Sequence, residues 1–133
     1  MGTSACEIRR RINFYEVDGA GIVHFSWYYR YMEEAEHALW RQAGLSLGLQ
    51  TGLALPRVAA GFEFKRPLRF DDEVDIRIEV ASIGRSSIGY RCTLSLDGDL
   101  IATGTMTVVC ASGPPGQMVP VPVPDAIREA LSA

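Results

Sequence analysis

Lysine and paired cysteines are what this sequence has least of. Of its 13 basic residues, only Lys65 is a lysine, and the rest are arginines. The three cysteines, Cys6, Cys92 and Cys110, are far apart and form no CxxC pair, which excludes a zinc ribbon and a thioredoxin-type redox motif. No apolar run approaches the length of a membrane span, and no apolar signal segment opens the chain. We therefore expect a cytoplasmic protein without membrane insertion.

The sequence also lacks the excess of positive charge that nucleic-acid binding requires. Its formal net charge is −3, and no helix-turn-helix segment is visible, so we expect no nucleic-acid partner. Apolar residues make up 47% of the 133 residues and charged residues 22%, which is the balance of a folded globular protein. This length predicts one domain, residues 1–133, with a core large enough to need no disulfides.

One long helical pattern covers residues 26–43. At roughly 100° per residue, the apolar side chains fill one arc of about 160°. These are Trp27, Tyr28, Tyr31, Met32, Ala35, Ala38, Leu39 and Ala43. The opposite arc carries Arg30, Glu33, Glu34, Glu36, His37 and Arg41, with Tyr29 and Trp40 as aromatic exceptions. We expect Ser26 to cap the start of this helix and Gly44 to end it.

Alternation with period two predicts the strands. It appears loosely in 8–15 and clearly in 60–70, 73–83, 88–96 and 100–110. The connections at Asp71-Asp72, Gly84-Arg85-Ser86 and Asp97-Gly98 are short, so these strands must pair antiparallel. A helix of about 27 Å beside strands of roughly 35 Å predicts an α+β arrangement in which the sheet wraps one helix.

The end of the chain is rich in proline. Five prolines lie within 112–124, which predicts an extended or mobile tail outside a core of about 8–110. A short helix, Asp125 to Leu131, is expected to follow, with Asp125 as its cap.

The segment between the first strand and the helix carries a family pattern. An aspartate, a glycine, two aliphatic residues, a His and Phe pair and a tyrosine follow one another as Asp18, Gly21, Ile22, Val23, His24, Phe25 and Tyr28. Glu33, Ala35, Pro67, Asp72-Glu73-Val74 and Gly84-Arg85-Ser86-Ser87 match further positions. In order and spacing, residues 8 to about 110 resemble the hotdog-fold acyl-CoA thioesterases, and most closely the branch similar to 4-hydroxybenzoyl-CoA thioesterase.

This resemblance implies a fold, an activity and an assembly. The fold would be an antiparallel sheet of five or six strands around one central helix. The activity would be hydrolysis of an acyl-CoA thioester, with Asp18 as general base or nucleophile and a backbone N–H near Phe25 polarising the carbonyl. The family forms dimers through edge strands, with active sites between subunits, and often forms tetramers, so we expect a homodimer or homotetramer.

Each candidate residue also has a structural interpretation. Asp18 beside glycine can simply close an Asx turn. His24 is a second catalytic candidate, but some relatives have histidine at the position of Phe25, so His24 could instead line the pocket or only form a hydrogen bond. Glu33 and Glu34 are expected to be charged-face residues, and Glu33 could support the Asp18 loop.

The expected substrate contacts lie in three parts of the chain. Gly21 and Tyr28 flank the catalytic segment, Arg66 sits on an apolar strand parity, and Arg85, Ser86 and Ser87 could hold a phosphate of CoA.

We expect no cofactor and no metal, because CoA is part of the substrate. Two functional alternatives remain. One is hydrolysis of a carrier-protein thioester or of dihydroxynaphthoyl-CoA, and the other is acyl-CoA binding without catalysis.

Overall fold

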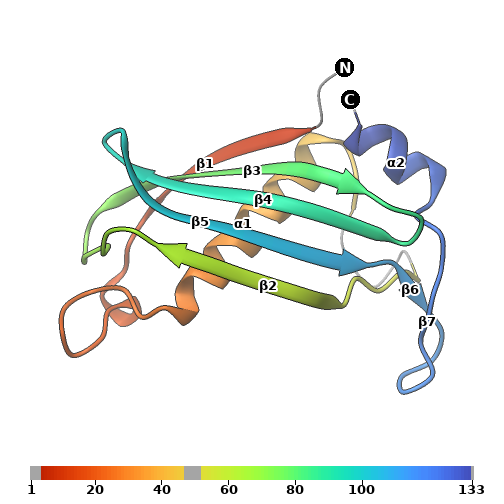
Figure 1. Cartoon of the computed structure of the whole chain (residues 1–133), viewed down its shortest axis with the longest axis horizontal. Helices are drawn as coiled ribbons and strands as arrows, with labels where there is room; N and C mark the ends of the chain where they lie inside the picture. Colours follow the sequence, from red (N-terminus) through yellow and green to blue (C-terminus); the bar gives the residue numbers. More distant parts are fainter. Residues whose placement is uncertain (1–3, 47–51, 133) are drawn as a thin grey trace.

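The alternating segments form one sheet, and the apolar helix lies against it. The computed structural model describes residues 4–46 and 52–132. Its elements are β1 (Ala5–Arg11), a 3₁₀ turn (Phe14–Glu16), α1 (Ser26–Gln42), β2 (Arg57–Phe64), β3 (Glu73–Ile83), β4 (Ser87–Leu96), β5 (Asp99–Val109), β6 (Ala111–Ser112), β7 (Val119–Pro120) and α2 (Asp125–Leu131). The long strands run antiparallel in the order β1-β3-β4-β5-β2 (Figure 1). The predicted α+β class and antiparallel sheet are confirmed, with five strands.

Register in the sheet places the predicted apolar parities on its inner face. Ile78 pairs with Cys92, and Tyr90 pairs with Met106, and all four side chains are buried. Between β4 and β5, Asp97 and Gly98 have φ angles of 51° and 86°. Positive φ at both central residues is the geometry of a type I′ turn, so the hairpin predicted from Asp-Gly is confirmed.

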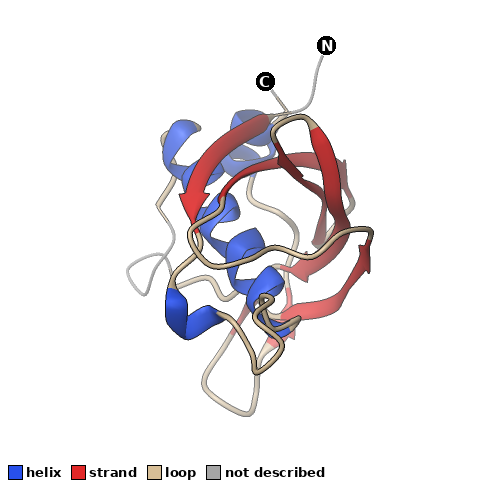
Figure 2. Ribbon diagram, turned by 90° about the vertical axis from the view of Figure 1, so that its left-hand side faces the viewer, coloured by secondary structure: helices blue, strands red, loops and turns tan. Residues whose placement is uncertain are grey.

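Helix α1 lies along the concave side of the curved sheet (Figure 2). Tyr31, Ala35 and Leu39 on its apolar arc have no exposed surface. The interpretation of Glu36 as a charged residue on the outer face of the helix is wrong, because Glu36 is 0% exposed. Trp40, the aromatic exception on the same arc, is also buried, at 2% exposed. The sheet covers more of the helix than its apolar arc. Both polar groups are therefore paired: Trp40 Nε1 donates to the Tyr90 hydroxyl at 2.9 Å, and Arg57 binds the Glu36 carboxylate.

Two predicted strands have shifted ends. The first strand was expected over 8–15 but spans Ala5–Arg11, since the chain turns at Phe14–Glu16 and buries the Glu16 side chain. The second was expected over 60–70 but spans Arg57–Phe64. Beyond Phe64 the chain reaches Pro67, which has no N–H to donate, and turns at Asp71, where φ is 74°.

The helix ends were predicted with mixed success. Gly44 has a φ of 77°, and Leu45 N–H donates to the Trp40 carbonyl at 2.9 Å, so the predicted stop of α1 is confirmed. Ser26 is not the cap, because Phe25 holds that position and Ser26 is the first helical residue. Asp125 is likewise the first residue of α2, which Pro124 precedes as cap.

Two residues near the end of the chain join the core, although most of the proline-rich tail is exposed, as expected. Val123 is 3% exposed and Leu131 is 0% exposed, and both belong to the main apolar cluster. Ser4 N–H also donates to the Leu131 carbonyl at 3.2 Å, which joins the start of β1 to α2. The core therefore extends beyond the expected 8–110. Within the described residues, no helix is both long and apolar enough to cross a membrane.

The contact between Gly104 and Phe62 gives a test of core packing. A Cβ at position 104 would lie 2.5–2.8 Å from three carbons of the Phe62 ring. Replacing Gly104 with Ala should therefore force the ring to move and lower the free energy of unfolding by about 1–3 kcal/mol, measured by urea denaturation. Gly61 lies on β2 and also pairs with β5, and a Cβ added there would have no atom within 4 Å. Gly61→Ala is therefore the control, and its free energy of unfolding should change little. Equal stability of the two variants would contradict this packing.

Candidate active site

The segment from Val17 to Val23 is a tight loop closed by backbone pairing. Val17 and Val23 form an antiparallel bridge. Asp18 N–H donates to the Ile22 carbonyl at 2.8 Å, and Gly21 N–H donates back to the Asp18 carbonyl at 2.9 Å. Gly21 has a φ of 80°, a conformation that favours glycine. The predicted substrate contact Gly21 is thus, first of all, the residue that lets this loop turn.

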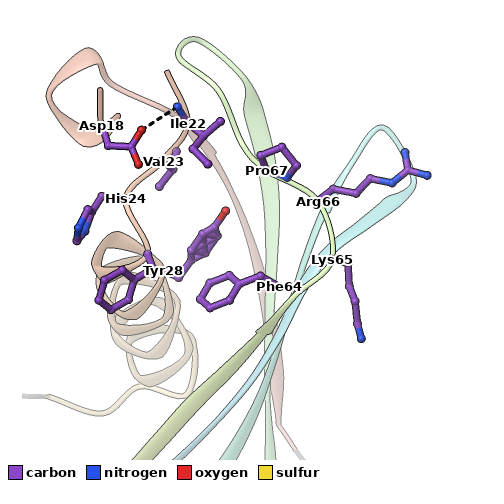
Figure 3. A pocket seen from close by; sticks show the side chains of 10 residues that line it. Asp18, Ile22, Val23, His24, Tyr28, Phe64, Lys65, Arg66 and Pro67 are labelled. Carbon is purple, nitrogen blue, oxygen red and sulfur yellow. Dashed lines mark hydrogen bonds between the residues drawn. The ribbon is translucent and has the colours of Figure 1, made fainter. Parts of the chain in front are cut away.

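The Asp18 carboxylate is exposed and only half engaged. Its Oδ1 accepts from Ala20 N–H at 2.8 Å and from Ile22 N–H at 3.4 Å (Figure 3). Among the described residues, no partner is present for Oδ2. The Asx turn and a reactive carboxylate are therefore compatible, because one oxygen fixes the side chain and the other is free to act.

The start of α1 offers an unpaired donor beside this loop. Within the part of the chain that the structure describes, Phe25 N–H has no acceptor. The next N–H, of Ser26, donates to His24 Nδ1 at 3.3 Å, and the Ser26 hydroxyl lies 2.8 Å from the same nitrogen. His24 Nδ1, one residue before the N-cap position of Phe25, therefore acts as a side-chain cap for the first N–H group of α1. The 17-residue helix adds the positive end of its dipole at Phe25.

These groups border one cavity of about 550 Å³. Its walls come from the 18–28 segment and from the connection after β2 (Figure 3). The lining residues are Asp18, Ile22, Val23, His24, Phe25, Tyr28, Phe64, Lys65, Arg66 and Pro67. Tyr28 and Phe64 meet edge to face with ring centroids 4.8 Å apart, and burial raises the pKa of the Tyr28 phenol, which therefore stays neutral. A cavity with an aromatic wall and a carboxylate at its rim can take an apolar group with a polar reacting end.

The predicted phosphate contacts do not all meet at this cavity. Arg85, Ser86 and Ser87 lie at or beside the turn between β3 and β4, and the Arg85 carbonyl accepts from Val123 N–H at 2.8 Å. β3 begins next to the site loop, where Ile12 N–H donates to the Asp72 carbonyl, and it runs about 36 Å away from it. Within one chain, the Arg85 turn is therefore at the opposite end of the sheet (Figure 1).

Arg66 lines the cavity but points away from Asp18 (Figure 3). Its Nη1 lies 3.3 Å from Asp99 Oδ2, and both side chains are largely exposed. Lys65 is the neighbouring cation that the sequence interpretation passed over. Its position beside Arg66, as the only lysine in the chain, was the available signal.

The helix carboxylates take other roles than expected. Glu33 pairs with Arg30 and Arg57, both at 3.6 Å, so it does not support the Asp18 loop. The loop is instead joined to Glu16, whose carbonyl accepts from His24 N–H at 2.9 Å and whose side chain is buried. The sequence interpretation missed Glu16, because it lies in the short 3₁₀ turn, where no periodicity signals burial. Within residues 4–46 and 52–132, no three His, Cys, Asp or Glu side chains are grouped so that they could hold a metal.

Known proteins are similar to this chain over most of its length. A family model described as the thioesterase-like superfamily matches residues 12–131. A 1,4-dihydroxy-2-naphthoyl-CoA hydrolase of Synechocystis sp. is 30% identical over 129 residues, which cover 93% of this chain and 92% of that protein.

Two solved structures extend the likeness. A gentisyl-coenzyme A thioesterase superposes with a TM-score of 0.85 at 29% identity, over 92% of this chain and 99% of the other. The 4-hydroxybenzoyl CoA thioesterase of Pseudomonas sp. superposes with a TM-score of 0.87 at 24% identity, over 96% and 99% of the two chains. The last likeness shows the shared fold, and with the family match it confirms the hotdog fold that the resemblance implied.

The His24 cap can be tested by stability alone. Replacing His24 with Ala removes the acceptor for Ser26 N–H and should lower the free energy of unfolding by about 1 kcal/mol. Asn is a strong N-terminal capping residue and places an acceptor at a similar distance from the backbone, so His24→Asn should retain most of the stability. Thermal unfolding of the two variants measures the difference. If His24→Ala is as stable as the parent protein, the cap contributes nothing.

Proposed function

The chain belongs to the thioesterase-like superfamily, and on this premise we propose that it hydrolyses an acyl- or aroyl-CoA thioester to the free acid and CoA. The observation that carries the proposal is the cavity that Asp18 and Phe25 both line, where, among the described residues, the Asp18 Oδ2 and the Phe25 N–H have no partner. Hydrolysis of a thioester needs a carboxylate that activates water or attacks the carbonyl itself, and a donor for the developing oxyanion; Asp18 and the Phe25 N–H can serve as these two groups.

The chemistry follows from these two groups. As general base, Asp18 takes a proton from water while the water oxygen bonds to the carbonyl carbon. The Phe25 N–H stabilises the negative oxygen of the intermediate. The carbon–sulfur bond then breaks, and the departing thiolate receives the proton from Asp18. As nucleophile, Asp18 would instead form a mixed anhydride that water hydrolyses. Both routes use the same free oxygen.

The aromatic wall favours an aroyl group. Phe25, Tyr28 and Phe64 border the cavity, and aromatic rings pack edge to face or offset against one another. The relatives named for dihydroxynaphthoyl-CoA and gentisyl-CoA act on aromatic thioesters, which supports dihydroxynaphthoyl-CoA as an alternative substrate. A carrier-protein thioester is the other enzymatic alternative. Rates of free-thiol release on aromatic, aliphatic and carrier-protein thioesters would separate the three.

His24 and the binding-only alternative both bear on whether the protein is a catalyst. Its Nδ1 is occupied by Ser26, which gives His24 a structural role, and we assign the acid–base work to Asp18. An acyl-CoA-binding protein without catalysis would bind these thioesters tightly and release no thiol.

We further propose that the reaction needs no cofactor, since CoA enters with the substrate. The three cysteines are free thiols, which fits the reducing cytoplasm as the compartment.

The edges of the sheet support a dimer through β2. The β1 edge carries Glu7, Arg9 and Arg11, and charged side chains discourage further pairing. The β2 edge presents an uncharged run over 58–62 in which Val58 is 60% exposed. We propose that a second copy pairs with β2, which places two cavities near one interface. A tetramer would then be a dimer of such dimers.

Replacing Asp18 with Asn tests the catalytic assignment. The Asn oxygen can still accept from Ala20 N–H, so the loop should keep its shape while the base is lost. We expect kcat to fall by about 10²–10⁴-fold with an unchanged unfolding temperature, followed by free-thiol release. Asp71→Asn is the control, because Asp71 is an exposed loop aspartate whose positive φ Asn tolerates. Full activity of Asp18→Asn would refute the assignment.

A lysine at the centre of β2 tests the dimer. Ala60→Lys adds a charge to the proposed pairing edge and should shift the protein towards monomer, measured by sedimentation velocity. Glu7→Lys places the same residue on the opposite edge and should leave the assembly unchanged. A shift in both variants, or in neither, would contradict pairing through β2.

A further inference from the structure

Glu16 is buried where the first strand, the site loop and the helix meet. Its side chain has no exposed surface. Oε1 accepts from three donors: Arg10 Nη1 at 2.5 Å, Asn13 N–H at 2.9 Å and the Tyr31 hydroxyl at 3.0 Å. Arg10 belongs to β1 and Tyr31 to α1, so one carboxylate oxygen ties both elements to the chain just before the loop.

The charge of Glu16 is matched to this position. Burial favours the neutral acid, but the hydrogen bonds from Arg10, Asn13 and Tyr31 outweigh it and hold the pKa of Glu16 below its usual value. The Arg10 guanidinium lies 4.6 Å from the Tyr31 ring centroid and also binds Glu34, with Nε 2.9 Å from Oε1. The carboxylate is thus ionised and held in one orientation.

The backbone of Glu16 holds the far side of the loop as well. Its carbonyl accepts from His24 N–H at 2.9 Å. Asp18 lies two residues after Glu16, and Phe25 follows His24 directly. The two groups proposed to attack the carbonyl and to stabilise its oxyanion therefore both lie within two residues of atoms that Glu16 fixes.

We propose that Glu16 is a positioning residue, which sets the Asp18 carboxylate and the Phe25 N–H in register across one cavity. The proposal rests on the proposed thioester hydrolysis. Glu16 touches no substrate and takes no part in proton transfer. Its effect comes from geometry, because a displacement of about 1 Å in a reacting group can cost about 10²-fold in rate.

Glu16→Gln is the variant that tests this role. The amide keeps the size of the side chain but removes the charge that Arg10 and Tyr31 bind. We expect kcat for an aroyl-CoA substrate to fall about tenfold to a hundredfold, while KM changes by less than about threefold. Unaltered kcat in a folded Glu16→Gln protein would overturn the proposal.

Glu34→Gln is the matched control. This change also removes a carboxylate that binds Arg10, but Glu34 lies on α1, and within residues 4–46 and 52–132 its side-chain hydrogen bonds go to Arg10 alone. Its kcat should stay within about twofold of the parent protein. An equal fall in both variants would mean that Arg10 pairing matters only for the fold, and the positioning role would be rejected.

Two further measurements keep the proposal testable in other circumstances. If Glu16→Gln does not fold, Tyr31→Phe is used in its place, because it removes one donor to Oε1; it should show a smaller fall in kcat and an unchanged KM.

If the parent protein cleaves no thioester, the proposed function fails. Amide hydrogen exchange then still tests Glu16, because His24 and Asp18 N–H should exchange at least about tenfold faster in Glu16→Gln than in Glu34→Gln. Equal protection would overturn the positioning role.

Discussion

The sheet buries a larger part of helix α1 than the apolar arc of that helix, and the rest of the structure depends on this constraint. The curved sheet covers Glu36 and Trp40 along with the apolar arc of α1. An unpaired buried charge is expensive, so a cation must follow each buried carboxylate inward. Arg57 meets Glu36 from β2, and Arg10 meets Glu16 from β1. The edge strands thus supply charge as well as hydrogen bonds to the core.

This burial also fixes the site. Because Tyr31, Met32 and Ala35 are fully enclosed, α1 has no freedom to slide, and its first N–H groups have a set direction. His24 joins the loop to the helix: its N–H donates to the Glu16 carbonyl, and its Nδ1 accepts from the Ser26 N–H. The site is exposed, yet its loop is tied through the His24 N–H to Glu16, which is buried. Such an arrangement keeps reacting groups in place without enclosing them.

Much of the fold could be predicted, because local rules decide it. The type I′ turn at Asp97-Gly98 and the glycine stop at Gly44 depend only on which residues accept positive φ. The limits of α1 followed from periodicity to within one residue at its end. Burial of Glu36 could not be predicted, because a helical pattern assigns a residue to a face but does not say how far the sheet will wrap.

The site was predicted in part for a similar reason. Asp18, His24, Phe25 and Tyr28 are neighbours in sequence, so one loop and one helix start bring them together. Arg85 was grouped with them by residue type, yet its distance follows from the pairing of β1 with β3, which joins residues far apart in the chain. Residue type indicates what a side chain can bind, and only topology decides where it stands.

The joined ends of the chain have a practical consequence. Ser4 bonds to the Leu131 carbonyl through its backbone, so the first and last described residues, Ser4 and Ser132, lie close together at the end of the sheet away from the Asp18 loop (Figure 1). A short peptide could therefore link the two ends, and new ends could be opened at the exposed Asp97-Gly98 hairpin. The order of strands along the chain would change while every pair in the sheet stayed the same.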